Sequence, residues 1–97
     1  MADICENKMY VYSEDPANIN YLSGWCKSNL DGYPELIDDN SFEYYFESRW
    51  DFPEKEMKEM VCELPNKKDI YIKVLSVEDT NYYCCFHVYE GDGWYVP

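Results

Sequence analysis

The stretch FEYYFESRWDFPEKEMKEMVCEL, residues 42–64, decides the fold, because a clear strand pattern is followed directly by a clear helix pattern. The first nine residues of the stretch alternate in character. One predicted face carries Phe42, Tyr44, Phe46, Ser48 and Trp50, and the other carries Glu43, Tyr45, Glu47 and Arg49. Such alternation is typical of a strand that is buried on one face and exposed on the other.

The rest of the stretch predicts an amphipathic helix. Asp51 is a suitable N-cap residue, and Glu54 stands at the position that closes a capping box on it. Four apolar residues then recur at i, i+3, i+4 and i+7, namely Met57, Met60, Val61 and Leu64. We expect this stripe to pack on a sheet beside Phe42 or Phe46, and beside Ile70 or Ile72.

Outward from this stretch, the pattern predicts further strands and one more helix. Residues 4–13 alternate as a strand, and a helix follows over 16–28, with Asp15 as its N-cap and Pro16 as its first residue. Its buried stripe is predicted to consist of Ile19, Leu22 and Cys26. Residues 29–41 hold turn residues and acids, so we expect an irregular loop with a helical turn at 35–37. The C-terminal part reads as strands over 69–77 and 82–89, with a short last strand over 94–96.

The predicted order is β-α-β-α-β-β, with a possible terminal strand. Ninety-seven residues form one domain, residues 1–97. Two amphipathic helices need a sheet face to bury against. We therefore expect an α+β two-layer sandwich with a mixed or antiparallel sheet of four to five strands and two helices on one face, ferredoxin-like in the broad sense.

The composition is strongly acidic, with 20 acidic against 8 basic residues and a formal net charge of −12. This charge can serve solubility, or it can attract a partner with a basic surface. It repels nucleic acid and anionic membranes, so we expect direct contact with neither. Five cysteines, two of them adjacent at Cys84 and Cys85, favour reduced thiols and a cytoplasmic location.

The residues that could carry chemistry do not assemble into a catalytic motif. Cys85 and the single histidine, His87, share a predicted strand face, but no Lys, Arg or helix N-terminus lies near them in sequence to activate the thiol. The cysteines lack the spacing of zinc ligands. The Gly91-containing turn lacks the oxygen-ligand spacing of a calcium loop. We expect no enzymatic activity, no cofactor and no metal.

Two acidic sets are the candidate partner-binding residues. The strand set consists of Glu43, Tyr45 and Glu47, whose two carboxylates are roughly 13 Å apart along a strand. The helix set consists of Glu56, Glu59 and Glu63. Exposed tyrosines beside carboxylates suit a binding surface, although cross-strand packing on the open sheet face explains the tyrosines equally well.

Three short motifs carry a family resemblance: CENKMYV at 5–11, FESRWDFP at 46–53 and YEGDGW at 89–94. Together they resemble the YubB-like ferredoxin-fold domain proteins of phages and plasmids. The chain departs from that family in having Asp3-Ile4 before the cysteine, Ser48 in place of threonine and Phe52 in place of the first proline of a pair. The resemblance implies the fold and an origin on a mobile element, a structural role for Trp50, Pro53 and Asn7, and no catalytic residue.

From charge and resemblance together, we expect a small phage or mobile-element protein that binds and inhibits a host defence nuclease or effector complex. This activity would be anti-CRISPR-like, with the acidic surface mimicking nucleic acid in a basic groove. A small-molecule binder for a nucleotide signal is the first alternative, and its anion site would have to use Arg49 with Lys73 and nearby tyrosines. An accessory phage protein without inhibitory role is the second. The oligomeric state stays open.

Overall fold

The computed structural model describes residues 4–49, 52–78, 83–91 and 93–97, and gives only the backbone of residues 36 and 37. Its elements follow in the order β-α-β-β-α-β-β-β. They are β1 (Ile4–Tyr12), α1 (Pro16–Asn29), β2 (Gly32–Asp38), β3 (Ser41–Arg49), α2 (Glu54–Cys62), β4 (Tyr71–Glu78), β5 (Tyr83–Glu90) and β6 (Gly93–Tyr95). The α+β prediction with two helices is confirmed.

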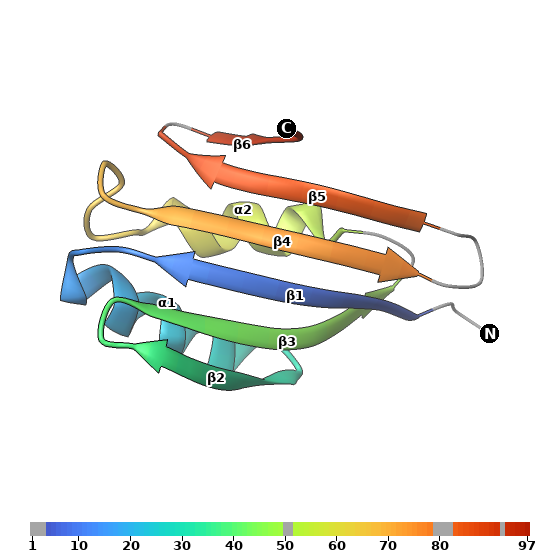
Figure 1. The fold of residues 1–97 in the computed structure, drawn as a ribbon, viewed down its shortest axis with the longest axis horizontal. Helices are drawn as coiled ribbons and strands as arrows, with labels where there is room; N and C mark the ends of the chain where they lie inside the picture. Colours follow the sequence, from blue (N-terminus) through green and yellow to red (C-terminus); the bar gives the residue numbers. More distant parts are fainter. Residues whose placement is uncertain (1–3, 50–51, 79–82, 92) are drawn as a thin grey trace.

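The strands form a single antiparallel sheet in the order β2-β3-β1-β4-β5-β6. Both helices lie behind this sheet, and its other face points toward the viewer in Figure 1. The expected four to five strands are therefore too few, because the sheet has six. Neither helix of the described chain is long and apolar enough to cross a bilayer.

The extra strand is β2, which lies where the sequence predicted an irregular loop with a helical turn at 35–37. That prediction was wrong because its turn residues are acceptable on an edge strand. Pro34 has no N–H to give to a ladder, but β2 pairs with β3 on one side only. Gly32 lies opposite Phe46 so closely that a Cβ on it would stand 2.0 Å from the Tyr45 carbonyl oxygen.

The helix starts agree only in part with the predicted caps. Asp15 caps α1 as predicted, since its Oδ1 accepts a hydrogen bond from the Ala17 N–H at 2.9 Å. Helix α2 begins after Pro53, which occupies the N-cap position without a side-chain hydrogen bond. The predicted cap, Asp51, lies outside the described residues. The helix ends at Cys62, earlier than its apolar stripe suggested.

The core fills the space between the sheet and the two helices. The predicted stripe of α2 is buried, together with Leu64 just beyond the helix, and it belongs to one cluster with Phe42, Phe46, Ile70 and Ile72. This part of the packing prediction is confirmed. In α1 the fully buried residues are Asn18, Leu22 and Cys26, whereas Ile19 is only partly buried.

Asn7 links three strands inside this core. Its Nδ2 donates to Ser48 Oγ on β3 at 2.9 Å, and its Oδ1 accepts from Ser76 Oγ on β4 at 2.7 Å. The side chain is only 3% exposed, so these protein groups, and not water, satisfy its hydrogen-bonding capacity. Its Nδ2 also lies 3.4 Å from the carbonyl oxygens of Cys5 and Phe46, so the structural role that the resemblance implies for Asn7 includes backbone groups as well as side chains. Strand β1 lies inside the sheet, and Asn7 joins it to both neighbouring strands.

Candidate functional site: the open face of the sheet

The face of the sheet opposite the helices, here called the open face, carries side chains in continuous rows across the strands. The antiparallel register places residues of neighbouring strands directly opposite one another, close enough for their side chains to touch. One row contains Tyr33, Tyr45, Lys8, Leu75 and Phe86. The next contains Glu35, Glu43, Tyr10, Lys73, Val88 and Tyr95.

A charged triad occupies the centre of the open face. Lys8 Nζ lies 3.3 Å from Glu43 Oε2, and the Tyr45 hydroxyl donates to Glu43 Oε1 at 3.1 Å. The hydrogen bond to Glu43 and its charge raise the pKa of Lys8. Partial burial and the same carboxylate raise the pKa of Tyr45. The charge of Glu43 is thus compensated by Lys8 within the protein, and the Glu43 side chain is only 20% exposed.

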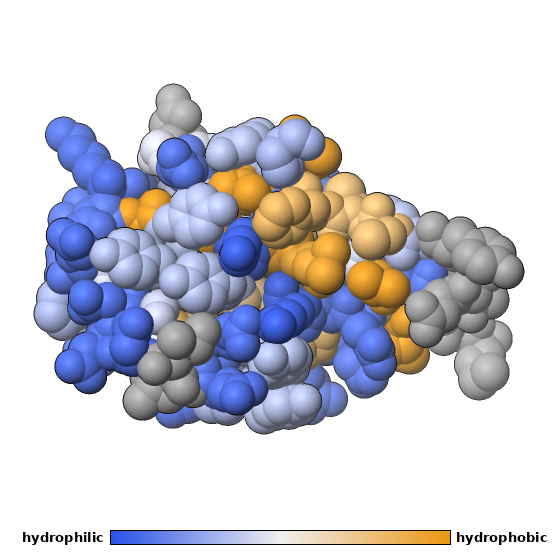
Figure 2. Space-filling model, viewed as in Figure 1, coloured by the Kyte–Doolittle hydropathy of each residue, from blue (hydrophilic) through white to orange (hydrophobic). Residues whose placement is uncertain are grey.

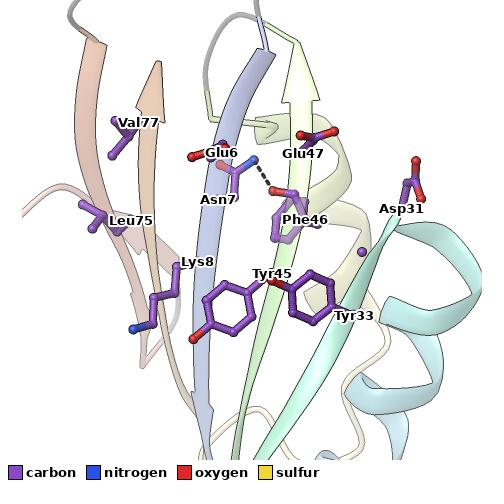
Figure 3. A pocket seen from close by; sticks show the side chains of 11 residues that line it. Glu6, Asn7, Lys8, Asp31, Tyr33, Tyr45, Phe46, Glu47, Leu75 and Val77 are labelled. Carbon is purple, nitrogen blue, oxygen red and sulfur yellow. Dashed lines mark hydrogen bonds between the residues drawn. The ribbon is translucent and has the colours of Figure 1, made fainter. Parts of the chain in front are cut away.

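A depression of about 580 Å³ lies beside this triad (Figure 3). Tyr33 and Tyr45 stack on one side of it, with ring centroids 5.3 Å apart and planes 21° from parallel. Leu75 and Val77 lie on the opposite side. Three carboxylates, those of Glu6, Asp31 and Glu47, lie toward one end, and Lys8 is also part of the lining. The depression thus combines an aromatic wall, an apolar wall and negative charge.

A second depression of about 360 Å³ adjoins the first and shares Lys8 and Leu75 with it. In its lining, Lys73 Nζ lies 5.1 Å from the centre of the Tyr10 ring, within range of a cation–π contact. Phe86 and Leu75 are 38% and 41% exposed. Figure 2 shows apolar side chains gathered on this face over β4 and β5. Large apolar groups left exposed in one patch are typical of contact surfaces.

The two predicted acidic sets lie on opposite sides of the molecule. The strand set projects onto the open face, where Glu47 is exposed and Glu43 is tied to Lys8. The helix set is exposed on α2 and at its C-cap, Glu63, on the side of the sheet that the helices cover. A flat partner surface can therefore contact one set at a time.

Among the residues that line the open-face depression, sequence reasoning singled out only Tyr45 and Glu47 as candidate binding residues. Tyr33 and Asp31 were placed in a loop, because β2 was not recognised. Glu6 was not singled out, since only the register of β1 with β3 puts it directly opposite Glu47. One signal could have found Tyr33. Tyr33 and Glu35 are two residues apart, as side chains on one face of a strand are, and they precede a clearly predicted strand in the sequence.

The Cys–His pair that the strand pattern suggested is present as a contact. Cys85 Sγ lies 3.9 Å from His87 Nε2. The imidazole stacks on Phe52, with ring centres 3.7 Å apart and planes 9° from parallel. This stacking gives the imidazole a packing role next to the start of α2. The described residues contain no group of three His, Cys, Asp or Glu side chains arranged to hold a metal ion.

The anion site of the small-molecule alternative is not assembled from Arg49 and Lys73. Arg49 lies opposite Ile4 on β1, whereas Lys73 lies opposite Tyr10, six residues further along the same strand. At the rise of an antiparallel strand, these rows are roughly 20 Å apart. The two cations therefore cannot hold the same phosphate group.

The thiols differ sharply in environment. Cys26 is fully buried, and this burial raises its pKa to about 12. Cys62 and Cys84 are exposed, Cys85 is half-buried, and none of these four forms a disulfide. Cys5 is buried, with its Sγ 3.9 Å from Asn7 Oδ1.

Comparison with known proteins identifies no relative of this chain. No protein-family model matches the chain, no curated protein matches it, and no solved structure matches it.

Proposed function

We propose that this protein is a non-catalytic binding protein that inhibits a host defence complex, in the manner of an anti-CRISPR protein. In this proposal, the open face of the sheet docks on a basic surface of the partner, such as the groove in which a defence nuclease holds nucleic acid. The observation that carries the proposal is the depression in which exposed carboxylates stand beside a stacked tyrosine pair.

The chemistry of that depression suits arginine and lysine side chains. A guanidinium group can pair with a carboxylate and stack on an aromatic ring at the same time. Glu6 and Glu47 lie directly opposite each other, and like charges in that position are unfavourable. A cation from a partner would relieve this repulsion. Binding would therefore remove an unfavourable interaction that is present in the unbound protein.

The net charge of −12 supports the same proposal at longer range. A strongly negative body is steered toward a basic groove, and the rate of encounter rises accordingly. The structure changes which acids we assign to the contact. Glu43 is compensated by Lys8, so Glu6, Asp31 and Glu47 are the carboxylates that we assign to the partner.

The proposed fold family is ferredoxin-like with an added C-terminal hairpin, as in a divergent YubB-like protein. Two observations support this assignment. The first six elements run β-α-β-β-α-β. The four strands among them are neighbours in the order β2-β3-β1-β4, to which β5 and β6 add at one edge. An origin on a phage or plasmid, and action in the host cytoplasm, are parts of the proposal.

The test begins with a phage-plaque assay in bacteria whose CRISPR system targets that phage. Expression of the protein should restore plaques, and expression of an unrelated acidic protein should not. With the purified effector complex, binding should weaken steeply between low and moderate salt, because exposed charges are screened beyond about 8–10 Å at physiological ionic strength. Duplex DNA or guide RNA should displace the protein. Salt-insensitive binding that nucleic acid does not compete away would refute mimicry.

A further inference from the structure

The two edges of the sheet are protected to very different degrees. Strand β2 ends the sheet on one side and carries Pro34, Glu35 and a bulge before Asp38, all of which discourage pairing with another strand. On the other side, β6 is only three residues long and pairs with Val88, Tyr89 and Glu90 of β5. Figure 1 shows that β6 lies along only part of the length of β5.

The uncovered part of β5 is centred on Cys84, Cys85 and Phe86. Among the described residues, no strand pairs with the outer side of these three. Residues 83–88 contain no charged side chain, whereas β1, β2, β3 and β4 each carry charged residues within the strand. A neutral edge with unpaired backbone groups is a template for a further strand.

The side chains beside this edge are apolar on the open face. Phe86 is 38% exposed, and its in-register neighbour Leu75 is 41% exposed. Cys84 is exposed on the same face. A strand added at this edge would therefore gain ladder hydrogen bonds and would also cover part of an apolar patch.

We propose that the first half of β5 is a self-association edge, at which a second copy of the chain pairs its own β5 in antiparallel orientation. A two-fold axis through the edge would place Cys84 and Phe86 of one copy beside the same residues of the other. Two six-stranded sheets would become one continuous sheet, and the open face would remain accessible on both copies.

The distribution of charge favours a second copy of the chain as the molecule that pairs with this edge. A partner recognised through its basic residues would find no carboxylate at residues 83–88. Two copies that each carry −12 repel one another over most of their surfaces, so they can approach only where charge is absent. The neutral edge of β5 meets that condition, and its pairing with itself leaves no charge buried.

Added salt should change the strength of self-association and the strength of partner binding in opposite directions. Added salt screens the repulsion between the two copies, with a Debye length of about 3 Å at 1 M against about 8 Å at physiological ionic strength. Self-association should therefore strengthen with salt, whereas docking in a basic groove should weaken. The dimer does not depend on the proposed function, and each can fail without the other.

The experiment is sedimentation equilibrium of the reduced protein between about 10 µM and about 1 mM, at low and high salt, a range that detects micromolar and weaker dimers. The mean mass should rise from 11.7 kDa toward twice that value, and further at high salt. Phe86→Lys and Cys84→Lys should each keep the protein monomeric. Tyr33→Lys makes the same charge change at the β2 edge and should dimerise like the wild type.

Cross-linking locates the contact independently of these variants. In a Cys62→Ser background, a short bis-maleimide should join two chains through Cys84 or Cys85, as peptide mass spectrometry would show. Circular dichroism should confirm that each variant is folded. A mass of 11.7 kDa throughout the range, undiminished association of Phe86→Lys, or failure to cross-link would each overturn the inference.

Discussion

Replacement of Asn18 by alanine should destabilise the protein more than replacement of any exposed polar residue. Asn18 is fully buried on α1, and its side chain holds the loop between α2 and β4. Its Nδ2 donates to the carbonyl oxygens of Asn66 and Asp69 at 2.7 and 2.8 Å, and its Oδ1 accepts from the Asn66 N–H at 2.9 Å. Alanine would remove all three hydrogen bonds and leave the Asn66 N–H without its partner, whereas the Asn66 and Asp69 carbonyl oxygens would keep their bonds to the Asp69 N–H and the Ser13 hydroxyl.

The size of the effect follows from those groups. The Asn66 N–H left unsatisfied costs about 1–3 kcal/mol, and each of the two other lost hydrogen bonds costs about 0.5–1.5 kcal/mol, part of which water can restore. We therefore expect the free energy of unfolding to fall by about 2–4 kcal/mol, out of the roughly 5–15 kcal/mol typical of a domain. For a domain of this size, that corresponds to a decrease in Tm of about 10–25 °C.

Urea denaturation followed by circular dichroism would measure the change. Asn29→Ala is the matched control, because the Asn29 side chain is exposed and its one hydrogen bond within the described part of the chain goes to the Trp25 carbonyl oxygen, at 2.9 Å. The control should lose less than about 1 kcal/mol. A free energy of unfolding for Asn18→Ala within about 0.5 kcal/mol of the wild type would refute the assignment of Asn18 as the link between the two segments.

Three further predictions test the fold. Leu64→Ala should cost about 2–5 kcal/mol in thermal or urea unfolding, because Leu64 is buried beyond the end of α2; an unchanged Tm would remove it from the core. Gly32→Ala should detach β2, since the new Cβ would meet the Tyr45 carbonyl oxygen, and hydrogen exchange at residues 32–38 should accelerate; unchanged protection would contradict this. Burial favours the neutral Cys26 thiol in the folded protein, so stability should be lost as pH rises from 9 to 12, by about 4 kcal/mol at 1.36 kcal/mol per pKa unit. In Cys26→Ala this loss should disappear, and a pH profile identical to that of the wild type would show that the thiol is not buried.

Much of the fold could be predicted from sequence because its elements carry strong local signals. The alternation of residues 42–49 and the apolar stripe that begins at Met57 each depend on one periodicity, and both faces were assigned correctly. The cap at Asp15 depends on a local hydrogen bond, which the sequence also indicates. Signals of this kind do not require knowledge of the neighbouring strands.

The remaining features depend on tertiary context. Strand β2 contains Gly32 and Pro34, which signal a turn unless the segment is known to be an edge beside β3. The burial of Asn18 in place of Ile19 becomes intelligible only when the loop near Asn66 is known to require hydrogen bonds.

The candidate site was predicted in part for the same reason. The alternation of β3 placed Tyr45 and Glu47 on the open face correctly. It could not reveal that Glu43 pairs with Lys8, because that contact depends on which strand lies beside β3. Register likewise brings Glu6 opposite Glu47.

The central claim, that the open face binds the partner, is tested most directly by two matched charge reversals in the plaque assay. Glu6→Lys with Glu47→Lys reverses two exposed charges on the open face, and Glu56→Lys with Glu59→Lys reverses two on α2. If the open face docks on a basic surface, the first pair should raise the Kd for the effector complex at least about tenfold, or about 1.4 kcal/mol, and should reduce protection of the phage, while the second pair leaves both nearly unchanged. Loss of protection in the α2 pair alone, or no protection by the wild-type protein, would contradict the account.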